Sequence, residues 1–128
     1  MPTFLTDNIS VTVKPSYEDK HSSPTNGRYV FSYTIEVKNQ GDLTVQLLSR
    51  HWYIFDSDGS HSEIKGEGVV GEQPIIHSGQ YHGYQSFCNL KTDMGMMWGS
   101  YIMKETETGR IFSVAIPDFQ LINPMRLN

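Results

Sequence analysis

The stretch RYVFSYTIEVKNQG, Arg28 to Gly41, decides the fold class of this chain. Within it apolar side chains occupy every second position, at Tyr29, Phe31, Tyr33, Ile35 and Val37. The positions between them are mostly polar. A period of two residues places alternate side chains on opposite faces of an extended chain. The stretch therefore predicts a half-buried antiparallel strand.

The same pattern recurs along the chain between turn signals. Further strands are expected from residue 9 to a stop near Pro15, over 42–56 as one long strand or two with a bend, and over 61–66, 80–90, 95–104 and 110–116. The segment 117–124 should close a sheet edge, because proline cannot donate to a central ladder. Asp58-Gly59 is a strong hairpin signal. No convincing helix is found.

Seven or eight short antiparallel strands predict an all-β sandwich of the immunoglobulin-like or fibronectin type III-like kind. We expect residues 1–128 to form a single domain, because the chain is long enough to bury a core of its own. The lone Cys88 cannot form an internal disulfide, in agreement with a reducing compartment.

Charge and composition exclude several classes of partner. The net charge is −4 and the ten basic residues are scattered, so no nucleic-acid partner is expected. No apolar run approaches the roughly 20 residues of a membrane span, and membrane insertion is not expected. The N-terminal residues lack the pattern of a signal peptide, so the expected location is the cytoplasm.

Three glycines, Gly66, Gly68 and Gly71, have the spacing G-x-G-x-x-G of a nucleotide diphosphate loop. That loop works at the start of a helix, whose amides meet the phosphates. Here Pro74 and Gly79 follow and would break a helix. We therefore favour a backbone role for the glycines, positive φ or close approach, although successive amides could still form an anion-binding nest.

Histidines are the candidate metal ligands of the chain. His61, His77 and His82 lie in the same stretch as several carboxylates and could in principle bind a divalent cation. None has the spacing that makes a metal motif specific, and isolated surface or hydrogen-bonded histidines are the favoured interpretation. No bound cofactor is expected.

No catalytic group stands out in the sequence. Cys88 lies in the predicted strand YQSFCNL, where a buried, inert thiol is favoured over a nucleophile. No pair of carboxylates suggests acid–base chemistry. We therefore expect no enzymatic activity.

The methionine-rich segment near residue 97 offers a candidate interaction surface. Alternation sends Met97, Tyr101 and Met103 to one face and Met96 and Trp98 to the other. The first face is expected in the core. The second could contact a partner protein, and Met96 and Trp98 are the candidate residues.

Four blocks of sequence resemble the ApaG family of small bacterial proteins. They are SRHWYIFDSDG (49–59), VVGEQPIIHSGQYHGYQSFCNL (69–90), GMMWGSYIM (95–103) and FSVAIPDFQL (112–121). They carry the family's patterns R-x-W, V-V-G-x-Q-P, Y-x-S, M-x-G-x-Y and I-P-x-F-x-L in order. His77 is a departure, because many relatives have proline or a charged residue there.

The resemblance implies a fibronectin-type sandwich and an association with cobalt tolerance and magnesium efflux. Similar domains are attached to eukaryotic F-box proteins and to a polymerase-interacting protein. Such reuse is typical of a binding module.

Two functional hypotheses follow. The first is a non-enzymatic cytoplasmic adaptor that binds an unidentified protein. The alternative is a regulator that senses a nucleotide polyphosphate, such as diadenosine tetraphosphate, or a divalent cation through the glycine loop. We expect a monomer or a weak homodimer, since an unpaired edge strand can pair with a second copy.

Overall fold

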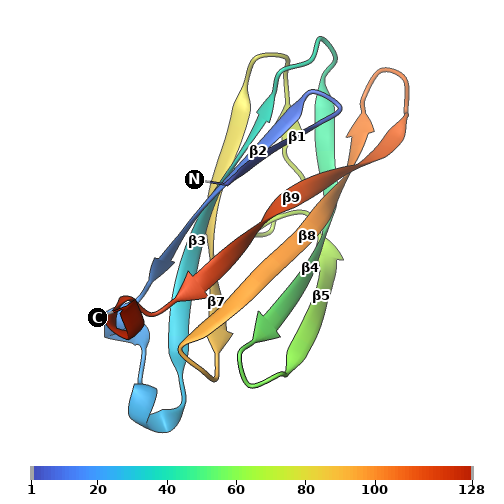
Figure 1. Ribbon diagram of the computed structural model, residues 1–128. Coiled ribbons are helices and arrows are strands. Elements are labelled where there is room, and N and C mark those ends of the chain that lie inside the picture. Colours follow the sequence, from blue (N-terminus) through green and yellow to red (C-terminus); the bar gives the residue numbers. More distant parts are fainter. Residues whose placement is uncertain (1, 128) are drawn as a thin grey trace.

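The alternating stretch forms strand β3 (Tyr29–Asn39), which lies inside the first of two antiparallel sheets in the computed structural model of residues 2–127 (Figure 1). This sheet has the order β1-β2-β3-β7 and contains β1 (Thr3–Thr6), β2 (Ile9–Tyr17) and β7 (Tyr81–Leu90). Val11, Val13, Ile35 and Val37 are fully buried on its inner face. The predicted all-β sandwich is confirmed.

The second sheet has the order β5-β4-β8-β9. Its strands are β4 (Val45–Asp56), β5 (His61–Glu67), β8 (Met94–Glu105) and β9 (Ile111–Ile122), and the two-residue β6 (Ile75–Ile76) also pairs with β4. The remaining elements are the 3₁₀ turns η1 (Asp19–His21), η2 (Pro24–Asn26) and η3 (Pro124–Leu127). Across residues 2–127, no helix has the length and apolar character needed to cross a membrane.

Strands β2 and β9 continue through Pro15 and Pro117, where the sequence predicts that a strand stops. Strand β2 continues past Pro15 to Tyr17, because β1 pairs with β2 only as far as Thr12 and leaves the Pro15 side of β2 unpaired there. Strand β9 continues through Pro117, so residues 110–116 and the segment 117–124 are not separate. The β8–β9 register shifts between Met97 and Gly99, opposite Pro117.

Strand β4 is one strand with a bend. Its register against β8 shifts between Leu47 and Ser49, which leaves Leu48 as a bulge. Beyond the bulge, Trp52 points into the core, where it is 2% exposed, and Tyr53 points outward. Strands β1 and β6 were not foreseen, because their short segments carry little alternation of their own.

The two long sides of the sandwich differ. On one side β1 and β2 both contact β9. On the other side β7 and β5 are the edge strands of their sheets (Figure 1), and residues from both line a cleft between the sheets. The interior can therefore be reached from the β5–β7 side.

The glycine loop, residues 66–72, starts in the last two residues of β5 and continues into a tight hairpin turn. The amide of Val69 donates to the Glu72 carbonyl at 2.7 Å, and the amide of Glu72 donates to the Val69 carbonyl at 3.0 Å. Between them Val70 and Gly71 have φ of 47° and 79°, as in a type I′ turn. Gly68 has φ of 61°, and a Cβ at this position would overlap the Glu72 carbonyl oxygen.

Replacing Gly68 with alanine should therefore destabilise the protein more than replacing Gly71. Both residues have positive φ, which costs a non-glycine residue about 1–2 kcal/mol, but only the Gly68 variant also forces a backbone overlap. We expect Gly68→Ala to lower the free energy of unfolding by at least about 2 kcal/mol and Gly71→Ala by about 1 kcal/mol. Urea unfolding measures both values, and equal losses would contradict the overlap.

Candidate functional site

The glycine loop is built around the side chain of Arg50. The guanidinium lies against Gly66, where a Cβ would stand 2.8 Å from both terminal nitrogens. Nη1 donates to the carbonyls of Glu67 and Gly68, at 3.0 Å each. The loop thus presents carbonyl oxygens to a cation.

Three of the loop amides donate hydrogen bonds within the fold. The amide of Gly68 donates to the Leu48 carbonyl at 2.8 Å, and the amides of Val69 and Glu72 donate across the turn. A phosphate cradle needs amides that point outward. The geometry of Gly66, Gly68 and Gly71 accordingly supports the backbone interpretation of these glycines.

The candidate metal ligands His61, His77 and His82 lie in three separate settings. His61 begins β5 and borders a hollow on the outer face of the sheet. His77 follows β6, and its Nδ1 lies 3.2 Å from Thr44 Oγ1. His82 lies on β7, with Nε2 3.9 Å from Glu72 Oε2. Over the described residues 2–127, no group of three or more His, Cys, Asp or Glu side chains is arranged to hold a metal ion.

The outer face of the five-stranded sheet carries a row of apolar side chains. Tyr53 and Trp98 are cross-strand partners on β4 and β8, and their rings stack at 5.8 Å with an interplanar angle of 12°. Phe55 on β4 and Met96 on β8 are also cross-strand partners. Tyr53 is 37% exposed and Phe55 39% exposed. We call these side chains, with Ile102, the outer aromatic face.

Polar side chains border the outer aromatic face on the β5 side. The ring of His51 stacks on Tyr53 at 4.5 Å, and its Nε2 lies 2.5 Å from Glu63 Oε1. Lys65 Nζ lies 3.6 Å from the same oxygen. The hydrogen bond from His51 lowers the pKa of Glu63, which keeps the carboxylate charged. A hollow of about 550 Å³ lies between Glu63 and the aromatic rings.

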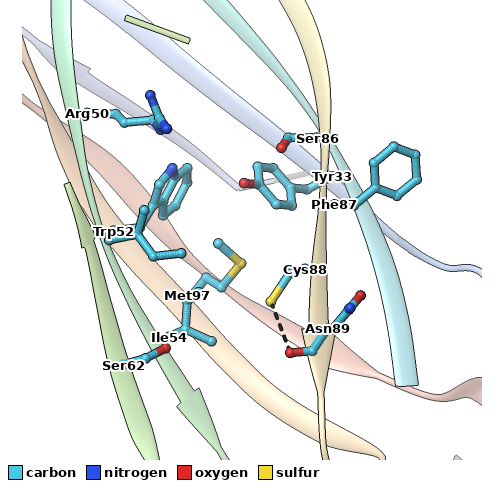
Figure 2. A pocket seen from close by; sticks show the side chains of 11 residues that line it. Tyr33, Arg50, Trp52, Ile54, Ser62, Ser86, Phe87, Cys88, Asn89 and Met97 are labelled. Atoms are coloured by element: carbon cyan, nitrogen blue, oxygen red, sulfur yellow. Dashed lines mark hydrogen bonds between the residues drawn. The ribbon is translucent and has the colours of Figure 1, made fainter. Parts of the chain in front are cut away.

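A second hollow lies inside the sandwich, on its open side (Figure 2). It has a volume of about 460 Å³ and is lined by β3, β4, β5, β7 and β8. Arg50 lies at one end, near the hydroxyls of Tyr33 and Ser86, whereas Trp52 and Met97 line the middle. We call this hollow the inner cleft.

Three tyrosines, of which Tyr33 lines the cleft, lie within electrostatic reach of Arg50. The hydroxyls of Tyr84 and Tyr101 form a hydrogen bond between β7 and β8. Burial raises the pKa of Tyr33, of Tyr84 and of Tyr101, and the positive charge of Arg50 opposes each increase. The three phenols are therefore neutral near pH 7, and Arg50 is the charged group close to all of them.

Sequence reasoning missed the residues of the inner cleft. Arg50 shares the inward face of β4 with Trp52 and Ile54. The alternation of the strand was therefore the signal that could have identified Arg50 as a cation facing the core. Ser86 is marked likewise by Tyr84 and Cys88 on β7. Tyr33 was recognised only as a core residue, because no sequence pattern shows that strand β3 faces a cleft.

Comparisons with known proteins agree with this fold. A family model described as the ApaG domain matches residues 19–105. A protein named ApaG from Anaeromyxobacter dehalogenans is 44% identical over 128 residues, all of both chains. Another, from Paramagnetospirillum magneticum, is 48% identical over 124 residues, 97% of this chain and 95% of that one.

Among solved structures, the putative ApaA protein from Bordetella pertussis is similar over 96% of each chain. The TM-score is 0.87 and the sequence identity is 38%.

Cys88 should be a poor nucleophile in the folded protein. Its side chain is buried, and burial, with a smaller effect from the Asp56 charge, raises the pKa of the thiol to about 12. At pH 8 the thiolate is thus far rarer than for an ordinary thiol of pKa about 8.5. We expect alkylation by iodoacetamide to be roughly 10²–10³-fold slower than in the urea-unfolded chain. Mass spectrometry of timed samples gives both rates, and equal rates would refute the inert thiol.

Proposed function

The chain belongs to the ApaG domain family, and from this premise we propose that it is a non-enzymatic, single-domain adaptor of the cytoplasm that binds another protein. The observation that carries the proposal is the outer aromatic face. It is a group of partly exposed apolar side chains on the side of the second sheet turned away from the sandwich core.

The composition of this face suits a protein interface. Interfaces that bind tightly have aromatic side chains at their centre and polar groups around the rim. Here Tyr53, Trp98 and Phe55 form the centre, and Glu63 and Lys65 lie on the rim. Because the Tyr53 and Trp98 rings already stack on one another, a partner would order few additional rotamers on binding.

The regulatory alternative has less support from the geometry. Amides of the glycine loop donate within the fold, which leaves fewer of them for a polyphosphate. The histidines named as metal candidates have separate partners, Thr44 for His77 and Glu72 for His82. An association with cobalt tolerance and magnesium efflux would then act through the protein partner.

Truncating the aromatic centre should weaken partner binding without unfolding the protein. Trp98→Ala removes a ring from the proposed centre, and loss of such a residue costs about 2 kcal/mol or more, roughly 30-fold in affinity. The measurement is quantitative affinity capture from native cells, followed by titration calorimetry with the recovered partner.

Phe87→Ala is the matched control for this experiment. Phe87 is an aromatic residue of β7 with an exposed fraction of 57%, and it belongs to the other sheet. A partner retained by Phe87→Ala and lost by Trp98→Ala supports the adaptor. The proposal fails when both variants lose the same partner, or when neither loses any.

A further inference from the structure

Arg50 carries a positive charge that the fold leaves without a counter-charge. Among the described side chains, no carboxylate forms an ion pair with Arg50. Its Nη1 bonds two neutral carbonyls, of Glu67 and Gly68. A partly buried charge is costly unless it is compensated. An anion that enters the inner cleft would supply this compensation.

The guanidinium is held in place before any ligand arrives. Gly66 lets it lie flat on the β5 backbone, and the two carbonyl bonds fix Nη1. This leaves the Nη2 side of the guanidinium, with its donors, for an incoming group. A cation fixed in this way loses little entropy when it binds an anion.

Two hydroxyls lie at the same end of the cleft. Tyr33 and Ser86 line it from β3 and β7, two neighbouring strands of the facing sheet (Figure 2). Tyr33 is 5% exposed, and its pKa is raised by burial, so the phenol remains a proton donor at neutral pH. Ser86 hydrogen-bonds the Tyr33 hydroxyl, which lowers the phenol pKa against the effect of burial. A carboxylate that displaces this bond would accept hydrogen bonds from the two hydroxyls and the guanidinium.

Away from Arg50 the cleft has an apolar middle and a polar far end, which Ser62 and Asn89 line. Trp52, Ile54 and Met97 line it below Arg50, and Cys88 lines it from β7 (Figure 2). The volume of about 460 Å³ is in the range of small-molecule sites, roughly 300–1,000 Å³. The shape therefore suits a ligand with one charged end and a hydrophobic body.

We propose that the inner cleft binds a small organic monocarboxylate, with its carboxylate on Arg50, Tyr33 and Ser86 and its apolar body against Trp52 and Met97. Arg50 is the only charged residue among those that line the cleft, so a single negative charge is matched. A nucleotide polyphosphate carries several negative charges and would leave most of them uncompensated.

The ligand-contacting side chains of this site differ from those of the outer aromatic face, although the hollows beside them share Ile54 and Ser62. Arg50, Trp52 and Ile54 point to the interior side of β4, whereas Tyr53 and Phe55 point to the opposite side. A variant of one site can therefore be tested without altering the other.

The test is a titration followed by ¹H–¹⁵N NMR, with 3-phenylpropionate and octanoate as probes. We expect saturable shifts at the amides of Ser86 and Cys88, at the Trp52 indole and at Arg50 Nε–H. The neutral analogue 3-phenylpropionamide should bind at least about tenfold more weakly, because it lacks the charge that Arg50 recognises. ATP should bind more weakly than either acid.

Four variants test whether binding of the acid depends on the charge and position of the Arg50 side chain. Arg50→Gln should weaken binding of 3-phenylpropionate at least about tenfold, and Arg50→Lys should restore part of it. Gly66→Ala should also weaken binding, since the added Cβ displaces the guanidinium. Arg28→Gln, at an exposed arginine outside the cleft, is the matched control and should bind as the unaltered protein does.

Loss of the Glu67 and Gly68 hydrogen bonds could unfold Arg50→Gln. In that case Gly66→Ala and Ser86→Ala decide the question, because neither removes the charge. The proposal is overturned by the absence of saturable shifts up to about 10 mM acid, which corresponds to negligible affinity. It is equally overturned when the amide or ATP binds as tightly as the acid, or when the folded Arg50 variants bind normally.

Discussion

The packing of Trp52 between the two sheets is the contact on which the other features depend. Its ring lies edge-on to Tyr33 of the first sheet at 5.4 Å and to Phe119 of β9 at 5.9 Å. Since side chains alternate along a strand, burying Trp52 directs Arg50 and Ile54 to the interior and Tyr53 and Phe55 to the outside. One orientation of β4 thus creates both the inner cleft and the outer aromatic face.

Much of the fold could be predicted because alternation is a local property. Tyr29 to Val37 showed a strand, and Met97 and Met96 were correctly assigned to opposite faces of β8. The extents of strands were less predictable, because they depend on neighbours distant in sequence. Pro15 is tolerated since β1 begins at Thr3, opposite Thr12, and does not extend along β2 to Pro15, which no pattern around Pro15 shows.

The candidate sites were harder to predict for the same reason. The spacing of Gly66, Gly68 and Gly71 was visible, but the group that packs on Gly66 is Arg50, which comes from the neighbouring strand. Tyr33 and Ser86 belong to the other sheet. Chemistry assembled from several strands across two sheets leaves no continuous motif, and the sequence shows only its separate parts.

The difference between the two sides of the sandwich explains why a charge can lie inside it. On the closed side, contacts of β1 and β2 with β9 keep the interior apolar, as at Val11 and Val114. On the open side, edge strands β5 and β7 leave a cleft through which water or a ligand reaches Arg50. A guanidinium is stable there because it can be solvated or paired, whereas on the closed side it would be neither. The glycine loop contributes by holding the Arg50 guanidinium against Gly66 and on the carbonyls of Glu67 and Gly68. The group bound at these glycines is therefore a cation, whereas a phosphate loop binds an anion.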